Sequence, residues 1–365
     1  MKYPTIEECR KRMEQLLAQP KFVKLAKDFL ANGKTQRIAN GLLSHRKTYN
    51  EQMQLCRDVL KTSYGQFRID DNKLRIDCFH DKEIVELTLD FYKHLDNLVG
   101  DNNTLHSRAV DNLQYLNFFH NKQWRPNCGR SGANKWINVY IENTIRDAGN
   151  TAHEFGHSES DNFVSGVNIK DEAMREFCTV IIDRIFPEFL ITKRPELKES
   201  LVNQFAEAQL ISKAKARLSL FEGAFVQMMA GNLTLDNALN QYLKVYGDNP
   251  GPASDLLERI DRAIAPQAGR DEEFIPLYET RYLFPQMIGV YAREQYLKNP
   301  EDFAKKFKYV LQHDYELTEE EALKLMDFPE KAELIEWYKQ NIAKIIQEEF
   351  DSLQKESEDD AENQP

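Results

Sequence analysis

Apolar residues recur every three or four positions over much of this chain, which is the spacing of one buried helix face. The first such segment, residues 5–32, stops at Gly33, and another, residues 82–98, stops at Gly100. Glycine commonly ends a helix because it accepts the left-handed backbone conformation. A further helix is expected from about Thr35 to Thr62.

The same spacing returns in the second half of the chain. From Thr144 to about Leu353 the pattern predicts one helix after another. Helix-breaking residues divide this part near Pro187, Pro195, Gly231, residues 247–252 and Asn299-Pro300. The final residues, 356–365, are acidic and are predicted to be disordered.

Two short segments, residues 115–120 and 135–142, are instead rich in aromatic and β-branched residues, which is typical of strands. The turn-rich sequence RPNCGRSGAN (125–134) separates them. A hairpin is also predicted over residues 66–79, where polar and apolar residues alternate. In the 135–142 strand, alternation places Ile137, Val139 and Ile141 on one face and Trp136, Asn138 and Tyr140 on the other.

Composition excludes several classes of protein. At 365 residues and 41% hydrophobic content, the chain can bury a core as one large domain or two lobes. It has no run of 18 apolar residues, and its charged start does not fit a signal peptide, so we expect a cytoplasmic protein without a membrane partner. A net charge of −11 argues against a nucleic-acid partner. The cysteines show no C-x-x-C spacing and are expected to be reduced thiols: Cys9, Cys56, Cys78, Cys128 and Cys178.

The segment NTAHEFGHSES (150–160) contains the motif H-E-x-x-H. On a helix, His153 and His157 lie one turn apart and can reach one metal ion. Glu154 lies beside that face, where its carboxylate can take a proton from zinc-bound water. Alternatively, the two histidines could be hydrogen-bonded core residues. The motif therefore predicts a zinc site whose remaining ligand must come from elsewhere.

A catalytic zinc ion has a third protein ligand and one open position. The next helical segment, KDEAMREFCTVIID (170–183), offers Glu172 and Glu176 one turn apart. Either carboxylate could bind the ion, and the other could hydrogen-bond a ligating histidine. Both could also lie on a solvated helix face.

These residues and their flanks resemble the thimet oligopeptidase and oligoendopeptidase F family of zinc peptidases. Residues 129–133, GRSGA, resemble the family's G-K-R-S-G-A-Y turn, and the strand INVYI, Thr144 and Asp147 follow in the family's order. REFCTVIID (175–183) resembles the segment with the family's glutamate ligand, which implies that Glu176 rather than Glu172 binds zinc. With a further match over 220–248, the resemblance extends over about residues 125–297.

The resemblance implies a mainly α, gluzincin-like zincin fold with a small β-sheet beside the active-site helix. It implies a reduced helical N-terminal lobe (1–110), a catalytic domain (111–355) and the acidic tail (356–365). The INVYI strand could be an ordinary interior strand or an exposed edge that an extended peptide substrate could join, and the resemblance favours the edge. Tyr282 and Tyr291, with Tyr278 in reserve, are the expected oxyanion donors, although each could be a core aromatic residue.

Three features depart from the family pattern. The segment between His157 and Glu176 is shorter than usual, Ser158-Glu159-Ser160 replaces small and apolar residues, and the whole chain is shorter than a typical member. The shorter chain puts the size of the substrate in doubt.

The sequence thus favours a zinc endopeptidase with one Zn²⁺ per chain, which cleaves oligopeptides or extended protein segments. A second hypothesis is a non-catalytic metal- or peptide-binding protein, although Glu154 would then have no purpose. A third is an exported bacterial effector protease that acts on one host protein, with the acidic tail as its export signal. The sequence does not indicate an oligomeric state.

Overall fold

The computed structural model describes residues 46–70, 72–74, 79–100, 104–120, 126–131, 133–142, 144–160, 163, 170–229, 232–233, 237 and 280–362. Helices dominate these residues, and a small three-stranded sheet accompanies them, so the predicted mainly α class is confirmed. Backbone proximity divides the chain into two compact units, residues 1–62 with 211–283 and residues 63–210 with 284–365. The predicted boundary near residue 110 lies inside the second unit.

The first unit contains α4 (Arg46–Lys61) and the second half of α10 (Lys198–Met229). The hydroxyl of Tyr49 on α4 donates a hydrogen bond to the carbonyl oxygen of Gly223 on α10, at 2.9 Å. A Cβ atom at Gly223 would lie 2.4 Å from the sulfur of Met53, so the glycine allows the two helices to approach closely.

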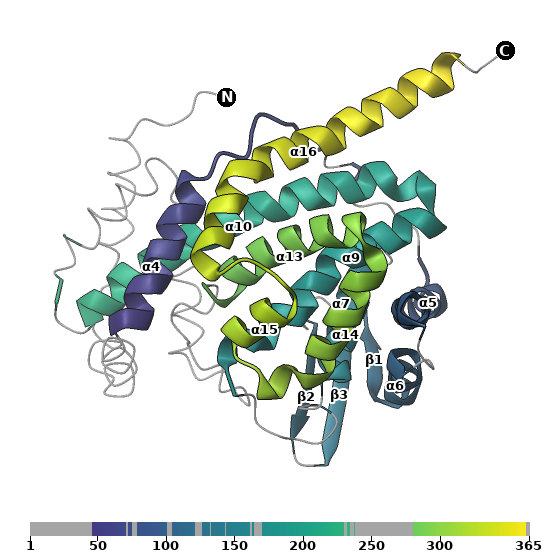
Figure 1. Cartoon of the computed structure of the whole chain (residues 1–365), viewed down its shortest axis with the longest axis horizontal. Coiled ribbons are helices and arrows are strands. Elements are labelled where there is room, and N and C mark those ends of the chain that lie inside the picture. The colour runs from purple at the N-terminus through teal and green to yellow at the C-terminus, as the bar shows by residue number, and fades with distance from the viewer. Residues whose placement is uncertain are drawn as a thin grey trace. The chain divides into compact units, whose positions relative to one another are not determined.

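The second unit contains the sheet and most of the helices (Figure 1). Its strands are β1 (Leu116–Phe119), β2 (Asn127–Ser131) and β3 (Asn134–Tyr140). Its α-helices are α5 (Asp81–Val99), α6 (Thr104–Asn112), α7 (Ile145–Glu159), α9 (Phe177–Lys193), most of α13 (Thr280–Lys298), α14 (Pro300–His313), α15 (Glu319–Leu325) and α16 (Lys331–Glu362), with the first part of α10. Its 3₁₀ helices are η1 (Leu113–Tyr115), η2 (Glu172–Glu176), η3 (Pro195–Leu197) and η4 (Asp314–Glu316).

The three strands are ordered β1-β3-β2, with β1 parallel and β2 antiparallel to β3. Ile137, Val139 and Ile141, which were predicted to share one face, are all buried, because they face the side of the sheet on which α7 packs. The expectation that this strand forms an edge is wrong, since β3 lies between the other two strands. The edge beside α7 is β2, which forms within the segment that was predicted to be only a turn-rich connection.

Several predicted helix ends agree with the structure. Helix α5 ends at Gly100, which adopts a φ of 68° and donates its backbone N–H to carbonyl groups of the last turn. Pro195 and Asn299-Pro300 also mark helix boundaries. The predicted break at Pro187 is wrong, because α9 continues through it. Proline in a helix interior costs about 3 kcal/mol, and the burial of α9 on nearly all sides outweighs this cost.

The predicted hairpin and the predicted disordered tail differ from the structure, and some other predictions lie outside the described residues. In the predicted hairpin, residues 72–74 form a turn and residues 66–70 form no strand, while residues 75–78 lie outside the described part of the chain. The backbone of residues 356–362, predicted to be disordered, continues α16 instead. This segment is rich in Glu and contains neither Gly nor Pro, so its composition permits a helix. The helix predicted over residues 5–32 and the breaks at Gly231 and 247–252 lie outside the described residues.

Within the described ranges, no helix combines the length and the hydropathy needed to cross a bilayer. Cys56, Cys128 and Cys178 are free thiols.

Candidate metal centre

Helix α7 carries the H-E-x-x-H motif and is fixed at its start and in its middle. The Asp147 carboxylate accepts hydrogen bonds from the backbone N–H groups of Thr144 and Glu142, at 2.8 and 2.9 Å, which caps the helix N-terminus. Directly before the motif, the Tyr92 hydroxyl of α5 donates to the carbonyl oxygen of Ala152, at 2.8 Å. The motif therefore lies on a helix that is anchored to the sheet connection and to α5.

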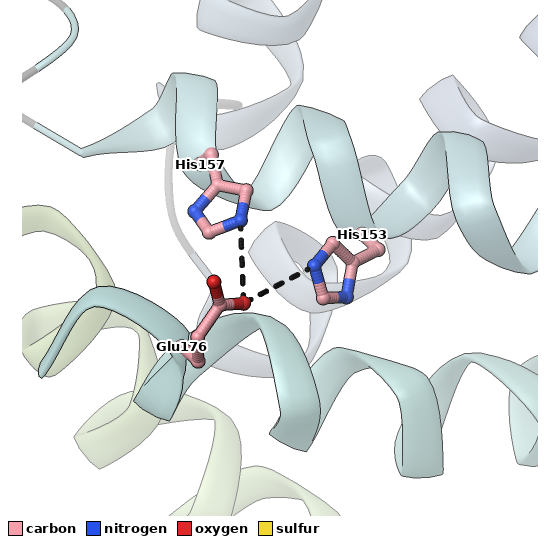
Figure 2. Close-up of side chains that lie close together, drawn as sticks. All are labelled: His153, His157 and Glu176. Atoms are coloured by element: carbon pink, nitrogen blue, oxygen red, sulfur yellow. Dashed lines mark ion pairs between the residues drawn. The ribbon is translucent and has the colours of Figure 1, made fainter. Parts of the chain in front are cut away.

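Three side chains with suitable donor atoms converge at this helix. Nε2 of His153 and Nε2 of His157 each lie 3.6 Å from Oε2 of Glu176, and the three atoms lie within 4.8 Å of one another. Figure 2 shows both imidazoles and the carboxylate pointing toward a common point. Zinc bonds of about 2.0–2.1 Å in a tetrahedral arrangement separate neighbouring ligand atoms by roughly 3.4 Å. The three donors therefore fit a zinc ion in both chemistry and spacing.

The position of Glu176 depends on the short helix η2 and on close packing between α7 and α9. Asp171 accepts a hydrogen bond from the backbone N–H of Ala173, at 3.0 Å, and so caps η2, which ends at Glu176. Gly156, between the two histidines, faces α9, where a Cβ atom would lie 2.5 Å from Cδ1 of Ile182. The absence of a side chain at Gly156 lets α9 approach α7 closely enough for Glu176 to reach both imidazoles.

A further carboxylate, Asp183, lies beside His153. Nδ1 of His153 is 3.0 Å from Oδ1 of Asp183. Because a carboxylate accepts hydrogen bonds, Nδ1 carries a proton, and Nε2 is the nitrogen on the side of Glu176 at which a metal ion would take the place of a proton. The sequence predicted that a carboxylate would hydrogen-bond one of the two histidines, but it offered Glu172 or Glu176 for this role rather than Asp183. The side chain of Glu172 lies outside the described part of the structure.

Glu154, the predicted proton acceptor, is buried on the same helix, with 5% of its surface exposed. Its Oε2 atom has no hydrogen-bond partner among the described residues. A buried carboxylate oxygen without a partner is costly, and the described residues contain a second such case in Glu159. Glu154 is thus a buried carboxylate directly after His153 on the same helix.

The local charges favour a cation. Burial raises the pKa of Glu154 to about 7, although His153 acts in the opposite direction. Burial also works against protonation of His153, but Asp183 and Glu176 outweigh it and hold the pKa of that imidazole well above its usual range. The pKa of His157 is lowered by burial to about 4. Three carboxylates around two imidazoles therefore create a site that a divalent ion would neutralise.

The predicted oxyanion donor Tyr282 belongs to the first unit, whereas the metal cluster belongs to the second. Its hydroxyl accepts a hydrogen bond from Nη2 of Arg281 at 2.7 Å, and Nζ of Lys215 lies 4.3 Å from the centre of its ring. Its catalytic role stays a prediction. Tyr278, the reserve candidate, lies outside the described residues.

The other candidate, Tyr291, is on α13 in the second unit. Its ring packs edge-on against Phe328 and Trp337, with centroid distances of 5.0 and 4.7 Å, and burial raises the pKa of its hydroxyl. These contacts are those of a packed aromatic residue, which was the alternative that the sequence left open. The structure brings His153, His157 and Glu176 together with Glu154 beside them, and it provides no contact between Tyr291 and this cluster.

Asp183→Asn is expected to weaken zinc binding by about 10- to 100-fold, because the amide no longer carries the charge that fixes the tautomer and orientation of His153. Competition with a chromogenic zinc chelator measures the effect. Asp90→Asn, which changes an exposed carboxylate on α5, is the control and should bind zinc like the parent. Unchanged affinity of Asp183→Asn would show that the hydrogen bond to His153 does not support a metal ligand.

No model of a known protein family matches the sequence, and no curated protein matches it. The fold is nevertheless similar to solved structures. One is a protein assigned as an oligoendopeptidase F from Bacillus anthracis str. Ames, with a TM-score of 0.58 and 11% identity, and the match covers 94% of this chain and 59% of that chain. Another is PZ peptidase A, solved with an inhibitor, with a TM-score of 0.56 and 9% identity, covering 89% of this chain and 58% of that chain. This chain spans about three-fifths of the length of both, and over that part it has a helical fold similar to theirs.

Proposed function

We propose that this chain is a zinc-dependent endopeptidase that hydrolyses oligopeptides or extended segments of proteins. One Zn²⁺ per chain would be held by His153, His157 and Glu176. The observation that carries the proposal is the convergence of these three donors beside the buried, unpartnered carboxylate of Glu154. The likeness of the fold to two peptidases supports the same reading.

Each residue has a distinct part in the proposed reaction. Zinc bound there would supply Lewis acidity for the scissile carbonyl group and would acidify water. Glu154 would accept a proton from the attacking water and deliver it to the departing amine nitrogen. Asp183 would keep His153 in the tautomer whose Nε2 is available as a donor.

The substrate would bind along the free edge of β2. Among the described residues this strand pairs with β3 alone, and it packs against α7, which carries the motif. An extended peptide could add to β2 through backbone hydrogen bonds, which depend little on the side chains of the peptide. This arrangement replaces the earlier expectation for β3, and it suits oligopeptides and unfolded segments rather than compact proteins.

Metal removal tests the proposal. We expect the purified chain to contain about one zinc ion and to cleave a quenched fluorescent peptide library. Treatment with 1,10-phenanthroline should abolish cleavage, and added Zn²⁺ should restore it, because zinc would bind again to His153, His157 and Glu176. The non-chelating isomer 1,7-phenanthroline is the control. Bound zinc without cleavage of any peptide or unfolded protein would contradict the peptidase and favour a metal-binding protein.

A further inference from the structure

Helix α7 ends two residues after His157, so this candidate ligand lies in the last turn of its helix. The last four carbonyl groups of a helix have no intrahelical donor, and the final turn is the part that frays. His153 lies a turn further inside and is held by Asp183. For Nδ1 of His157, the described residues provide no such hydrogen-bond partner. Among the described residues, the orientation of His157 therefore depends more on the backbone of its helix turn than the orientation of His153 does.

Two side chains of α6 hold that turn. Nδ2 of Asn112 donates to the carbonyl oxygen of Ser158 and to its Oγ, each at 3.1 Å. Nη1 of Arg108 donates to the carbonyl oxygen of Glu159, at 2.9 Å. Arg108 and Asn112 are four residues apart, so they project from the same face of α6. We call these two residues the α6 donors.

Helix α6 is itself fixed by a buried charge. The carboxylate of Asp96, at the end of α5, accepts hydrogen bonds from the backbone N–H groups of Leu105 and His106, at 3.3 and 2.9 Å. It also pairs with Lys308 of α14, and both charged side chains are buried. A carboxylate at a helix N-terminus that is also paired with an ammonium group is a rigid attachment. The α6 donors therefore extend from a firmly held helix.

The serine residues after the motif take part in the same arrangement. Oγ of Ser158 donates to the carbonyl oxygen of Phe155, at 2.8 Å, and Oγ of Ser160 donates to the buried carboxylate of Asp314. Small or apolar residues, which the resemblance leads one to expect here, could not make these bonds. The two serines of the departure Ser158-Glu159-Ser160 thus have polar partners around the end of α7, whereas Glu159 is bonded to Arg108 through its backbone carbonyl oxygen.

We propose that Arg108 and Asn112 are positioning residues for the zinc site, which hold the last turn of α7 so that Nε2 of His157 stays within reach of the ion. This inference rests on the proposed zinc function. In the proposed site, Asp183 orients His153 through a direct hydrogen bond, whereas the α6 donors would orient His157 through the backbone of the last turn. Loss of either donor would leave a buried carbonyl group without a partner and would loosen the turn that carries His157.

The test compares Arg108→Met and Asn112→Ala with the parent and with Ser107→Ala, which changes an exposed residue of the same helix. Zinc affinity is measured by chelator competition, and the geometry of the site by the visible absorption spectrum of the Co²⁺-substituted protein. We expect each α6 variant to bind zinc about 10- to 100-fold more weakly and to show an altered Co²⁺ spectrum. Ser107→Ala should match the parent in both measurements.

Arg108→Lys provides the second comparison, since it keeps a donor on a long stem and should recover most of the lost affinity. If Arg108→Met or Asn112→Ala fails to fold, Arg108→Lys still tests the proposal. The folded Arg108→Lys protein should then bind zinc more weakly than the parent but less than about 10-fold more weakly. Folded variants with parental zinc affinity and an unchanged Co²⁺ spectrum would overturn the role of the α6 donors. Failure of the parent itself to bind zinc would instead contradict the proposed function.

Discussion

Glu154→Gln is expected to lower the rate of peptide cleavage by roughly 10²–10⁴-fold while zinc stays bound. Glutamine has nearly the shape of glutamate, but its amide cannot accept the proton of the attacking water. Glu154 makes no hydrogen bond through Oε2 to a described residue, so the substitution breaks no visible structural contact there. The measurements are kcat on a quenched fluorescent peptide and zinc content by atomic emission.

Glu86→Gln is the matched control, because it changes an exposed glutamate on α5 and should leave both measurements at the parental level. A Glu154→Gln protein that binds zinc and still cleaves peptides at near the parental rate would remove Glu154 from the proposed reaction. In that case another group would have to accept the proton.

His157→Ala and His153→Ala are each expected to weaken zinc binding by about 10²–10³-fold. Apparent binding free energies of structural zinc sites are about 10–16 kcal/mol, so one ligand contributes on the order of 3–4 kcal/mol. Both imidazoles lie 3.6 Å from Glu176, so neither is a better candidate than the other by distance. Chelator competition measures the affinity, and peptide cleavage should fall with zinc content.

His313→Ala is the control for these variants, since His313 is at the end of α14 and bonds only to the carbonyl oxygen of Tyr309 among the described residues. Zinc affinity that stays at the parental level in both histidine variants would show that the three donors do not form the metal site. The proposed function would then lose its basis.

Much of the site could be predicted because it depends on local geometry. The spacing of His153 and His157 on a helix is sufficient to place both imidazoles on one face. Glu176 could be proposed because it follows in the next helical segment, and the family resemblance favoured it over Glu172. Asp183 could not be assigned to His153 in advance. Its position depends on how closely α9 packs against α7, which no local pattern contains.

In the sheet, too, the local sequence pattern was sufficient for one strand but not for another. The strand over residues 134–140 was predictable because β-branched and aromatic residues alternate there. Strand β2 was not, since Asn127, Gly129 and Ser131 have low strand propensity and become a strand only by pairing with β3. As a result, the edge that could receive a peptide was assigned to the wrong strand.

The close approach at Gly156 also bears on how the motif should be interpreted in sequences alone. A methyl carbon at this position would lie 2.5 Å from Cδ1 of Ile182 and 3.1 Å from Cγ2 of Thr179, so these side chains, or α9 with them, would have to shift away from α7. All the candidate metal ligands would still be present, yet a shift of α9 would also move Glu176, which directly precedes it, away from the imidazoles. In this fold the residue with no side chain helps to set the spacing of the candidate metal ligands.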